Sequence, residues 1–144
     1  MTSTIYKSFI DTNILIYALD QADPVRQQKA RALLKTLQEK ETGVISTQIL
    51  QEFFVVSTAK LKLKIDLVKK IIITLKNFKT ITVDLKIIEE AIDCSALNKI
   101  TFWDALVVTT AKAAGCHSIW SEDLGHGQLI DGVRIINPFI EPAK

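Results

Sequence analysis

Short apolar runs and apolar stripes at helical spacing alternate along this chain. The short runs predict buried strands over residues 5–10, 44–45, 80–83, 117–120 and 133–136. The stripes predict helices over residues 13–19, 24–40, 47–60, 66–77, 85–97 and 102–114. Because strand and helix patterns alternate, we expect an α/β fold, a three-layer α/β/α sandwich around a mainly parallel sheet of about five strands.

Several boundaries carry recognisable start and stop signals. Asp23 precedes Pro24, a pair that is typical of an N-cap followed by the first helical position. Ser46 and Thr101 are further candidate N-caps, and Gly115 is a candidate helix stop. The segment 60–64 alternates lysine with leucine and fits either a turn or an extended piece.

Composition narrows the class of protein. The 144 residues are 48% apolar, which suits one domain over residues 1–144 with a full core. No apolar run reaches 18 residues and no signal peptide is expected at the N-terminus, so we predict a cytoplasmic protein without a membrane span.

Cys94 and Cys116 share no metal-ligand spacing and are expected to be buried thiols of a reducing compartment. Trp103 and Trp120 are expected in the core or in an interface.

Four acidic residues occupy positions where the surrounding pattern is apolar. Asp11 stands where the first apolar run stops, and Asp123 follows the fourth run. Asp104 opens a helix that is apolar nearly all round, and Glu52 lies on the apolar stripe of its helix. A buried carboxylate is costly unless something pairs with it, so these positions are candidates for chemistry.

Each of these acids also has a purely structural interpretation. Asp11 fits the N-cap of the next helix, and Asp104 fits a capping box with Thr101. Glu52 at the edge of its stripe can reach water or pair with a lysine. Asp123 can belong to an ordinary acidic turn. The alternatives stay open for each residue alone, and only the set of four favours a shared site.

The four acids belong to elements that meet at one edge of a parallel sheet, where such folds place their ligands. Carboxylates gathered there repel one another, and a hard divalent cation removes that penalty. We therefore predict Mg²⁺ or Mn²⁺ at this edge, with Asn13 and Ser121 adding neutral oxygens or hydrogen bonds to ligated water. Such metals suit phosphoryl chemistry. The chain has no zinc-ligand pattern, P-loop, dinucleotide fingerprint or serine-hydrolase elbow.

Residues 60–79 are rich in lysine. Lys60, Lys62 and Lys64 are candidates for contacts with RNA phosphates, and His126 is a further one because it lies near the last acid in sequence. A solvated helix face and a flexible loop are the alternative interpretations. The apolar residues interleaved with the lysines fit a surface for a partner protein.

Four segments resemble, in order, the motifs of the PIN-domain family of metal-dependent ribonucleases: residues 9–13 (FIDTN), 51–53 (QEF), 103–105 (WDA) and 121–124 (SEDL). The tail over residues 126–139 resembles the small VapC-type toxins of toxin–antitoxin pairs, so the resemblance covers essentially the whole chain. It implies that Asp11, Glu52, Asp104 and Asp123 are catalytic and hold Mg²⁺ or Mn²⁺. It also implies an RNA substrate, a homodimer and inhibition by an antitoxin.

The leading functional hypothesis is therefore a metal-dependent endoribonuclease, the toxin of a type II pair. One alternative is a non-catalytic module that binds RNA or protein on the same fold. Another is a phosphatase with an aspartate nucleophile, but such enzymes of the haloacid-dehalogenase type need a second aspartate two positions on, where this chain has Asn13.

Overall fold

The computed structural model describes residues 6–140, and these contain one six-stranded sheet. The strands are β1 (Ser8–Ile10), β2 (Gly43–Ser46), β3 (Lys79–Ile81), β4 (Ser118–Trp120), β5 (Leu129–Ile130) and β6 (Val133–Ile136). They lie in the order β3-β2-β1-β4-β6-β5, and every neighbouring pair is parallel except the antiparallel pair of β5 and β6. The predicted mainly parallel sheet is confirmed, with β5 as an added edge strand.

Three strands (β1, β3 and β4) are shorter than their predicted runs, whereas β2 is longer than the predicted 44–45 and β6 matches the predicted 133–136. The first run was expected to form a strand over 5–10, but residue 5 lies outside the described residues and the strand is Ser8–Ile10. The third strand begins and ends earlier than the predicted 80–83. Apolar side chains next to a strand can pack in the core without joining the hydrogen-bonded ladder, so a run marks burial more reliably than it marks strand ends.

Six helices connect the strands of the described chain. They are α1 (Thr12–Tyr17), α2 (Pro24–Glu39), α3 (Thr47–Ala59), α4 (Ile65–Leu75), α5 (Leu85–Asn98) and α6 (Phe102–Ala113). All six predicted helices are present. The ambiguous segment 60–64 is a loop between α3 and α4, and Lys62 in it has a left-handed backbone with φ of 59°.

The expected capping residues occupy their places. The side chains of Asp23, Ser46 and Thr101 accept hydrogen bonds from backbone N–H groups in the first turns of α2, α3 and α6. Each such bond satisfies a donor that has no partner within the helix. Gly115 follows α6 with φ of 75°, a conformation that glycine adopts without strain.

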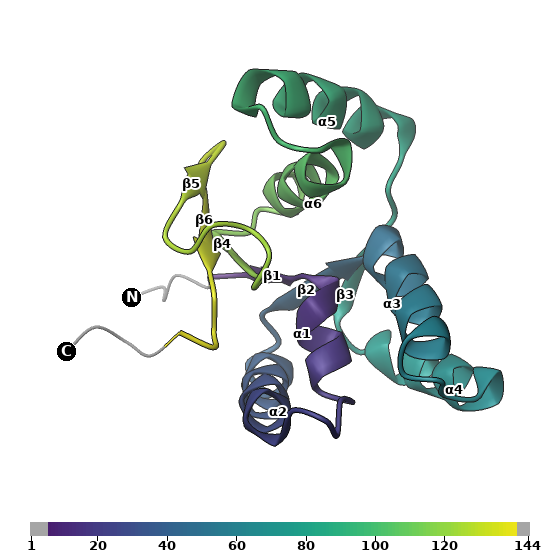
Figure 1. The fold of residues 1–144 in the computed structure, drawn as a ribbon. Coiled ribbons are helices and arrows are strands. Elements are labelled where there is room, and N and C mark those ends of the chain that lie inside the picture. Colours follow the sequence, from purple (N-terminus) through teal and green to yellow (C-terminus); the bar gives the residue numbers. More distant parts are fainter. Residues whose placement is uncertain (1–5, 141–144) are drawn as a thin grey trace.

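Helices cover both faces of the sheet, as the sandwich prediction required (Figure 1). In that view α5 and α6 lie on one side of the strands and α1 and α2 on the other, with α3 and α4 beside α1. Helix α6 is buried from Ala105 to Ala111 because the sheet and α5 enclose it. The core also contains Phe9, Ile10 and Phe53, none more than 1% exposed.

None of the helices in residues 6–140 has the length and apolar character that crossing a membrane requires.

Cys94 and Cys116 are buried free thiols, as expected, and burial raises the pKa of both, that of Cys116 to about 11. Protonated thiols are poor nucleophiles, so these cysteines have the character of packing residues.

Candidate active site

The sheet order places a ligand crevice next to β1. From β1 the chain runs outward through β2 to β3, and it returns to the opposite side of β1 with β4 and β6. In parallel sheets, the point at which the strand order reverses leaves a crevice outside the carboxyl ends of the two central strands. Asp11 follows β1 and Ser121 follows β4, so both residues lie at this point.

Asp11 is the most buried acid of the crevice. Its side chain is the N-cap of α1, as the structural interpretation proposed, and it accepts a 2.8 Å bond from the N–H of Thr12. The other carboxylate oxygen accepts a 2.7 Å bond from the hydroxyl of Ser121. Burial raises the pKa of Asp11 from 3.8 to about 6, the negative charges of Glu52 and Asp123 add to that increase, and the hydrogen bonds oppose it.

Glu52 reaches the crevice from α3. The hydroxyl of Thr12 donates a 3.0 Å hydrogen bond to its carboxylate, which joins α3 to the start of α1. The side chain is half-buried, and burial raises the pKa of Glu52, with smaller contributions in the same direction from the charges of Asp104 and Asp123. The inward orientation predicted from the helical stripe is confirmed.

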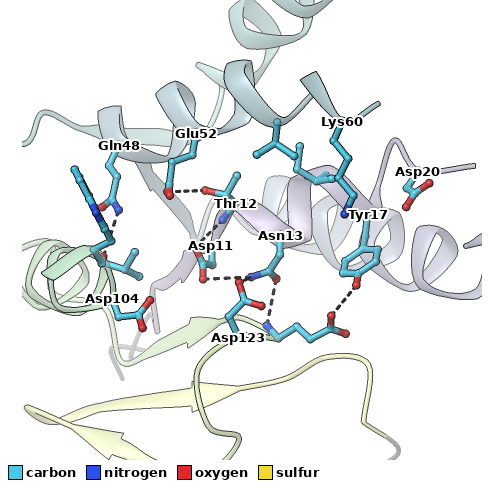
Figure 2. A pocket seen from close by; sticks show the side chains of 15 residues that line it. Asp11, Thr12, Asn13, Tyr17, Asp20, Gln48, Glu52, Lys60, Asp104 and Asp123 are labelled. Carbon is cyan, nitrogen blue, oxygen red and sulfur yellow. Dashed lines mark hydrogen bonds between the residues drawn. The ribbon is translucent and has the colours of Figure 1, made fainter. Parts of the chain in front are cut away.

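Asp104 and Asp123 complete the acidic lining. Asp104 lies in the first turn of α6, where its N–H donates to the hydroxyl of Thr101 at 3.1 Å. This is the backbone half of the expected capping box, and the carboxylate itself faces the pocket (Figure 2). Asp123 lies in the exposed turn after β4 and accepts a 3.1 Å hydrogen bond from the amide of Asn13.

Asn13 and Ser121, the predicted supporting residues, link Asp11 to the turn that carries Asp123. The Asn13 amide nitrogen lies 3.3 Å from Asp11, 3.1 Å from Asp123 and 3.4 Å from the Ser121 hydroxyl. Its carbonyl oxygen accepts a 3.2 Å bond from the N–H of Glu122. The amide therefore stands between two carboxylates and offers its N–H groups to both (Figure 2).

All four predicted acids line one pocket of about 310 Å³. Its lining side chains are those of Asp11, Thr12, Asn13, Ile16, Tyr17, Asp20, Gln48, Glu52, Val56, Lys60, Trp103, Asp104, Val107, Glu122 and Asp123. Six of these residues are acidic, and Lys60 is the single cationic residue among them. A pocket with this balance repels a phosphate unless a cation lies between them.

The donor set fits a hard divalent cation better than it fits a soft one. Carboxylate, amide and hydroxyl oxygens dominate the lining, and no histidine or cysteine belongs to it. As they stand, however, no three Asp, Glu, His or Cys side chains of residues 6–140 form a group that could hold a metal ion. Asn13 bridges the Asp11 and Asp123 carboxylates instead, so a metal ion could be held here only if side chains rotated.

The candidate RNA contacts divide into two groups. Lys60, at the end of α3, extends into the pocket near Tyr17 (Figure 2). Lys62 and Lys64 are exposed in the following loop and do not line the pocket. His126 is exposed and accepts a 3.0 Å hydrogen bond from the N–H of Asn137, which orients it toward the C-terminal segment.

A second charged group at the pocket rim was not anticipated from the sequence. Glu122 accepts a 2.6 Å bond from the hydroxyl of Tyr17 and a 2.8 Å bond from Arg26. The hydrogen bond to Glu122 is the main cause that raises the pKa of Tyr17 to about 12, and the two contacts together tie α1 and α2 to the turn after β4. Tyr17 lies one helical turn after Asn13, and that spacing is the signal that could have revealed it.

Trp103 and Gln48 were also missed as pocket residues. Trp103 is 63% exposed, so of the two expected places, the core and an interface, the core is excluded for it, whereas Gln48 is only 4% exposed. The side-chain amide of Gln48 donates a 3.3 Å hydrogen bond to the backbone carbonyl of Trp103 and so links α3 to the first turn of α6.

Solved structures of similar fold come from bacterial toxin–antitoxin systems. A toxin–antitoxin complex from Klebsiella pneumoniae has a TM-score of 0.67 at 20% identity, over 92% of this chain and 98% of that one. A Mycobacterium tuberculosis VapC toxin that cleaves the sarcin-ricin loop has a TM-score of 0.67 at 14% identity, over 81% and 90%. DNA-bound VapBC from Salmonella typhimurium has a TM-score of 0.66 at 16% identity, over 90% and 96%.

Comparison with curated proteins finds no match for this sequence. The model of one protein family, the PIN domain, matches residues 8–129. That match includes all four predicted acids of the pocket and most of the chain. The protein belongs to the PIN-domain family.

Proposed function

We propose that this protein is a metal-dependent endoribonuclease that hydrolyses RNA phosphodiester bonds. The observation that carries the proposal is the single pocket lined by the four predicted acids, which come from four separate segments, next to one lysine. The Mycobacterium tuberculosis neighbour of the same fold cleaves the sarcin-ricin loop, which is consistent with RNA as the substrate class.

Mg²⁺ or Mn²⁺, when bound, lowers the pKa of a water molecule and neutralises charge on the phosphate. The residues suited to hold the metal are Asp11 and Glu52, with Asp123 closing the rim. Asp11, with a pKa of about 6, is ionised at neutral pH and available as a ligand. Asn13 and Ser121 orient that carboxylate through their hydrogen bonds.

Asp104 has a separate role in this proposal. It lines the pocket from α6, across from the Glu52 carboxylate on α3, and it orients the attacking water. Lys60 neutralises a phosphate oxygen of the bound RNA at the outer end of the pocket. Hydrolysis then forms a bond from the water oxygen to phosphorus and breaks the bond from phosphorus to the leaving ribose oxygen.

The toxin role rests on the fold and on exposed apolar surface. Similar solved structures contain an antitoxin together with the toxin. In this chain, large apolar side chains are exposed along α3 and α4, including Phe54, Val55, Ile65, Leu67 and Ile73. Such a surface suits a homodimer and a cognate antitoxin. Light scattering should give about twice the mass of the 16.1 kDa chain, and expression of the free protein in the cytoplasm should arrest growth.

The decisive experiment compares two first-turn aspartates. Asp104→Asn removes a carboxylate from the pocket, and Asp66→Asn removes one from the first turn of α4, outside it. With Mn²⁺ and a structureless RNA, Asp104→Asn should lose at least 100-fold of the cleavage rate, while Asp66→Asn keeps the wild-type rate. Both variants should melt cooperatively. Equal cleavage by the two variants would refute the proposal.

The same preparation separates the alternatives. A phosphatase with Asp11 as nucleophile would form a phospho-aspartate. Such an enzyme needs an acid two residues after Asp11, and in this protein that position holds the amide of Asn13. A non-catalytic module would bind RNA without cleaving it, and calorimetric titration of the wild type with Mn²⁺ would then show no binding.

A further inference from the structure

A second hollow, of about 380 Å³, adjoins the acid pocket. The two share Gln48, Glu52, Val56 and Trp103, and the second adds Gln51 and Val55. The wall combines two valines and an indole with three polar side chains, the amides of Gln48 and Gln51 and the carboxylate of Glu52. Because the hollow is continuous with the acid pocket, it can receive the part of a ligand that adjoins the group bound in the acid pocket.

Trp103 is the prominent side chain of this hollow. It is 63% exposed although it belongs to a helix that is buried over most of its length. Its ring meets that of Phe102 edge to face, with the centroids 5.3 Å apart, which holds the indole at the mouth of the hollow. Large exposed aromatic rings beside a binding pocket are suited to stacking against flat ligands.

Gln48 supplies an independent observation. Its amide nitrogen is committed to the carbonyl of Trp103 at 3.3 Å, and its carbonyl oxygen is buried without any hydrogen-bond partner. The contact with the Trp103 carbonyl identifies the nitrogen of the Gln48 amide, because an amide oxygen in that position would be repelled by the carbonyl oxygen. The free atom is thus an acceptor, and buried acceptors almost always have a donor.

From these observations we propose that the hollow binds one nucleobase of single-stranded RNA, next to the phosphate that is cut. The base stacks on Trp103, and its exocyclic amino group donates to the free oxygen of Gln48 as the indole adjusts over it. This inference rests on the proposed nuclease function. A base fits better than a peptide segment because the hollow opens into the acid pocket, where the phosphate of the same nucleotide is bound.

The chemistry of the acceptor predicts a preference among bases. Adenine, cytosine and guanine carry an exocyclic amino group, and uracil carries none. Stacking on the indole is available to all four, so overall affinity depends on Trp103 and discrimination depends on Gln48. The preferred nucleotide beside the cut should therefore be one with an amino group.

Binding is measured by fluorescence anisotropy with labelled oligonucleotides and Mg²⁺, in the Asp104→Asn background so that the RNA stays intact. Trp103→Ala should weaken binding of an oligoadenylate by about 5- to 150-fold, and Trp103→Phe should weaken it by much less. The matched control is Tyr6→Ala, because Tyr6 is an aromatic residue of 62% exposure that precedes β1, at the opposite end of the strand from Asp11. It should bind as the parent protein does.

Gln48→Met keeps the length of the side chain and removes the acceptor. It should bring the affinities for adenine- and uracil-containing oligonucleotides together, whereas a merely structural role would weaken both equally and leave their ratio unchanged. An oligonucleotide with one abasic position beside the cut should lose affinity for the parent protein but not for Trp103→Ala.

The outcomes separate this inference from the nuclease proposal. If the wild type cleaves RNA while Trp103→Ala binds every oligonucleotide as tightly as the parent, the base site is overturned and the nuclease stands. If Trp103→Ala instead lowers the mass seen by light scattering with RNA affinity intact, the indole belongs to a protein interface and the base site is again overturned. A wild type that cleaves no RNA overturns both.

Discussion

Replacement of Asp11 by asparagine should stabilise the fold at neutral and alkaline pH. The carboxylate is buried at the end of β1, and burial raises its pKa from 3.8 to about 6. A folded-state pKa above the unfolded value means that the folded protein holds the proton more tightly. Asp11 therefore favours folding most strongly below pH 3.8, and this advantage is lost as the pH rises through 6.

The size of the effect follows from the two pKa values. At about 1.4 kcal/mol for each pH unit between 3.8 and about 6, ionised Asp11 costs roughly 3 kcal/mol at pH 8. The side chain of asparagine is uncharged, so the Asp11→Asn variant avoids this cost. Part of the gain is offset because the new amide N–H₂ faces the donors of Ser121 and Asn13, at about 1 kcal/mol. A net gain of about 2 kcal/mol corresponds to a Tm increase of roughly 4–8 °C.

The assay is thermal melting by circular dichroism in metal-free buffer, from pH 4 to pH 8. The Tm difference between Asp11→Asn and the wild type should be largest at pH 8 and should vanish or reverse near pH 4. Asp66→Asn, which removes an exposed first-turn charge from α4, should stay within about 0.5 kcal/mol of the wild type. A variant that is less stable than the wild type at pH 8 by the same margin as at pH 4 would show that burial of the Asp11 charge costs nothing.

Three further outcomes are expected. In activity assays, EDTA should abolish RNA cleavage and Mg²⁺ or Mn²⁺ should restore it. The same ions should raise the Tm of the wild type but not that of Asp11→Asn. Cleavage that continues without any divalent ion would contradict this prediction. Lys60→Gln should raise the KM for RNA several-fold and Lys70→Gln, on the exposed face of α4, should not, as measured at two salt concentrations. Gly43→Ala should cost about 1–3 kcal/mol in urea unfolding, because the added Cβ would lie 2.7 Å from the ring of Phe78; an unchanged midpoint would mean that the ring moves freely.

Much of the fold could be read from local pattern. The six helices appear where the stripes predicted them, and Ser46 and Thr101 cap their helices as expected. Capping and amphipathic spacing involve residues within a few positions of one another, so the sequence carries them directly. The placement of Asp11 at a strand end and of Glu52 on an inward stripe followed from the same local rules.

Other features depended on contacts between distant segments. The order β3-β2-β1-β4-β6-β5 brings residues about 110 positions apart into one hydrogen-bonded group, as in the bond from Ser121 to Asp11. Local periodicity contains no information on which strand lies beside which. It likewise could not separate Lys60, which enters the pocket, from Lys62, which does not. Local periodicity also could not predict that Trp103 is exposed.

The sequence by itself determined the order of the helices and of every strand except β5, the ends of most helices, and the positions of the candidate acids on these elements. Only the tertiary structure decided that these acids share one pocket, that Asn13 links two of them and that a tryptophan and a buried amide line the hollow beside them. The physical reason is that helix and strand patterns arise from neighbours along the chain, whereas burial, pKa and pocket shape arise from segments that meet only when the sheet assembles.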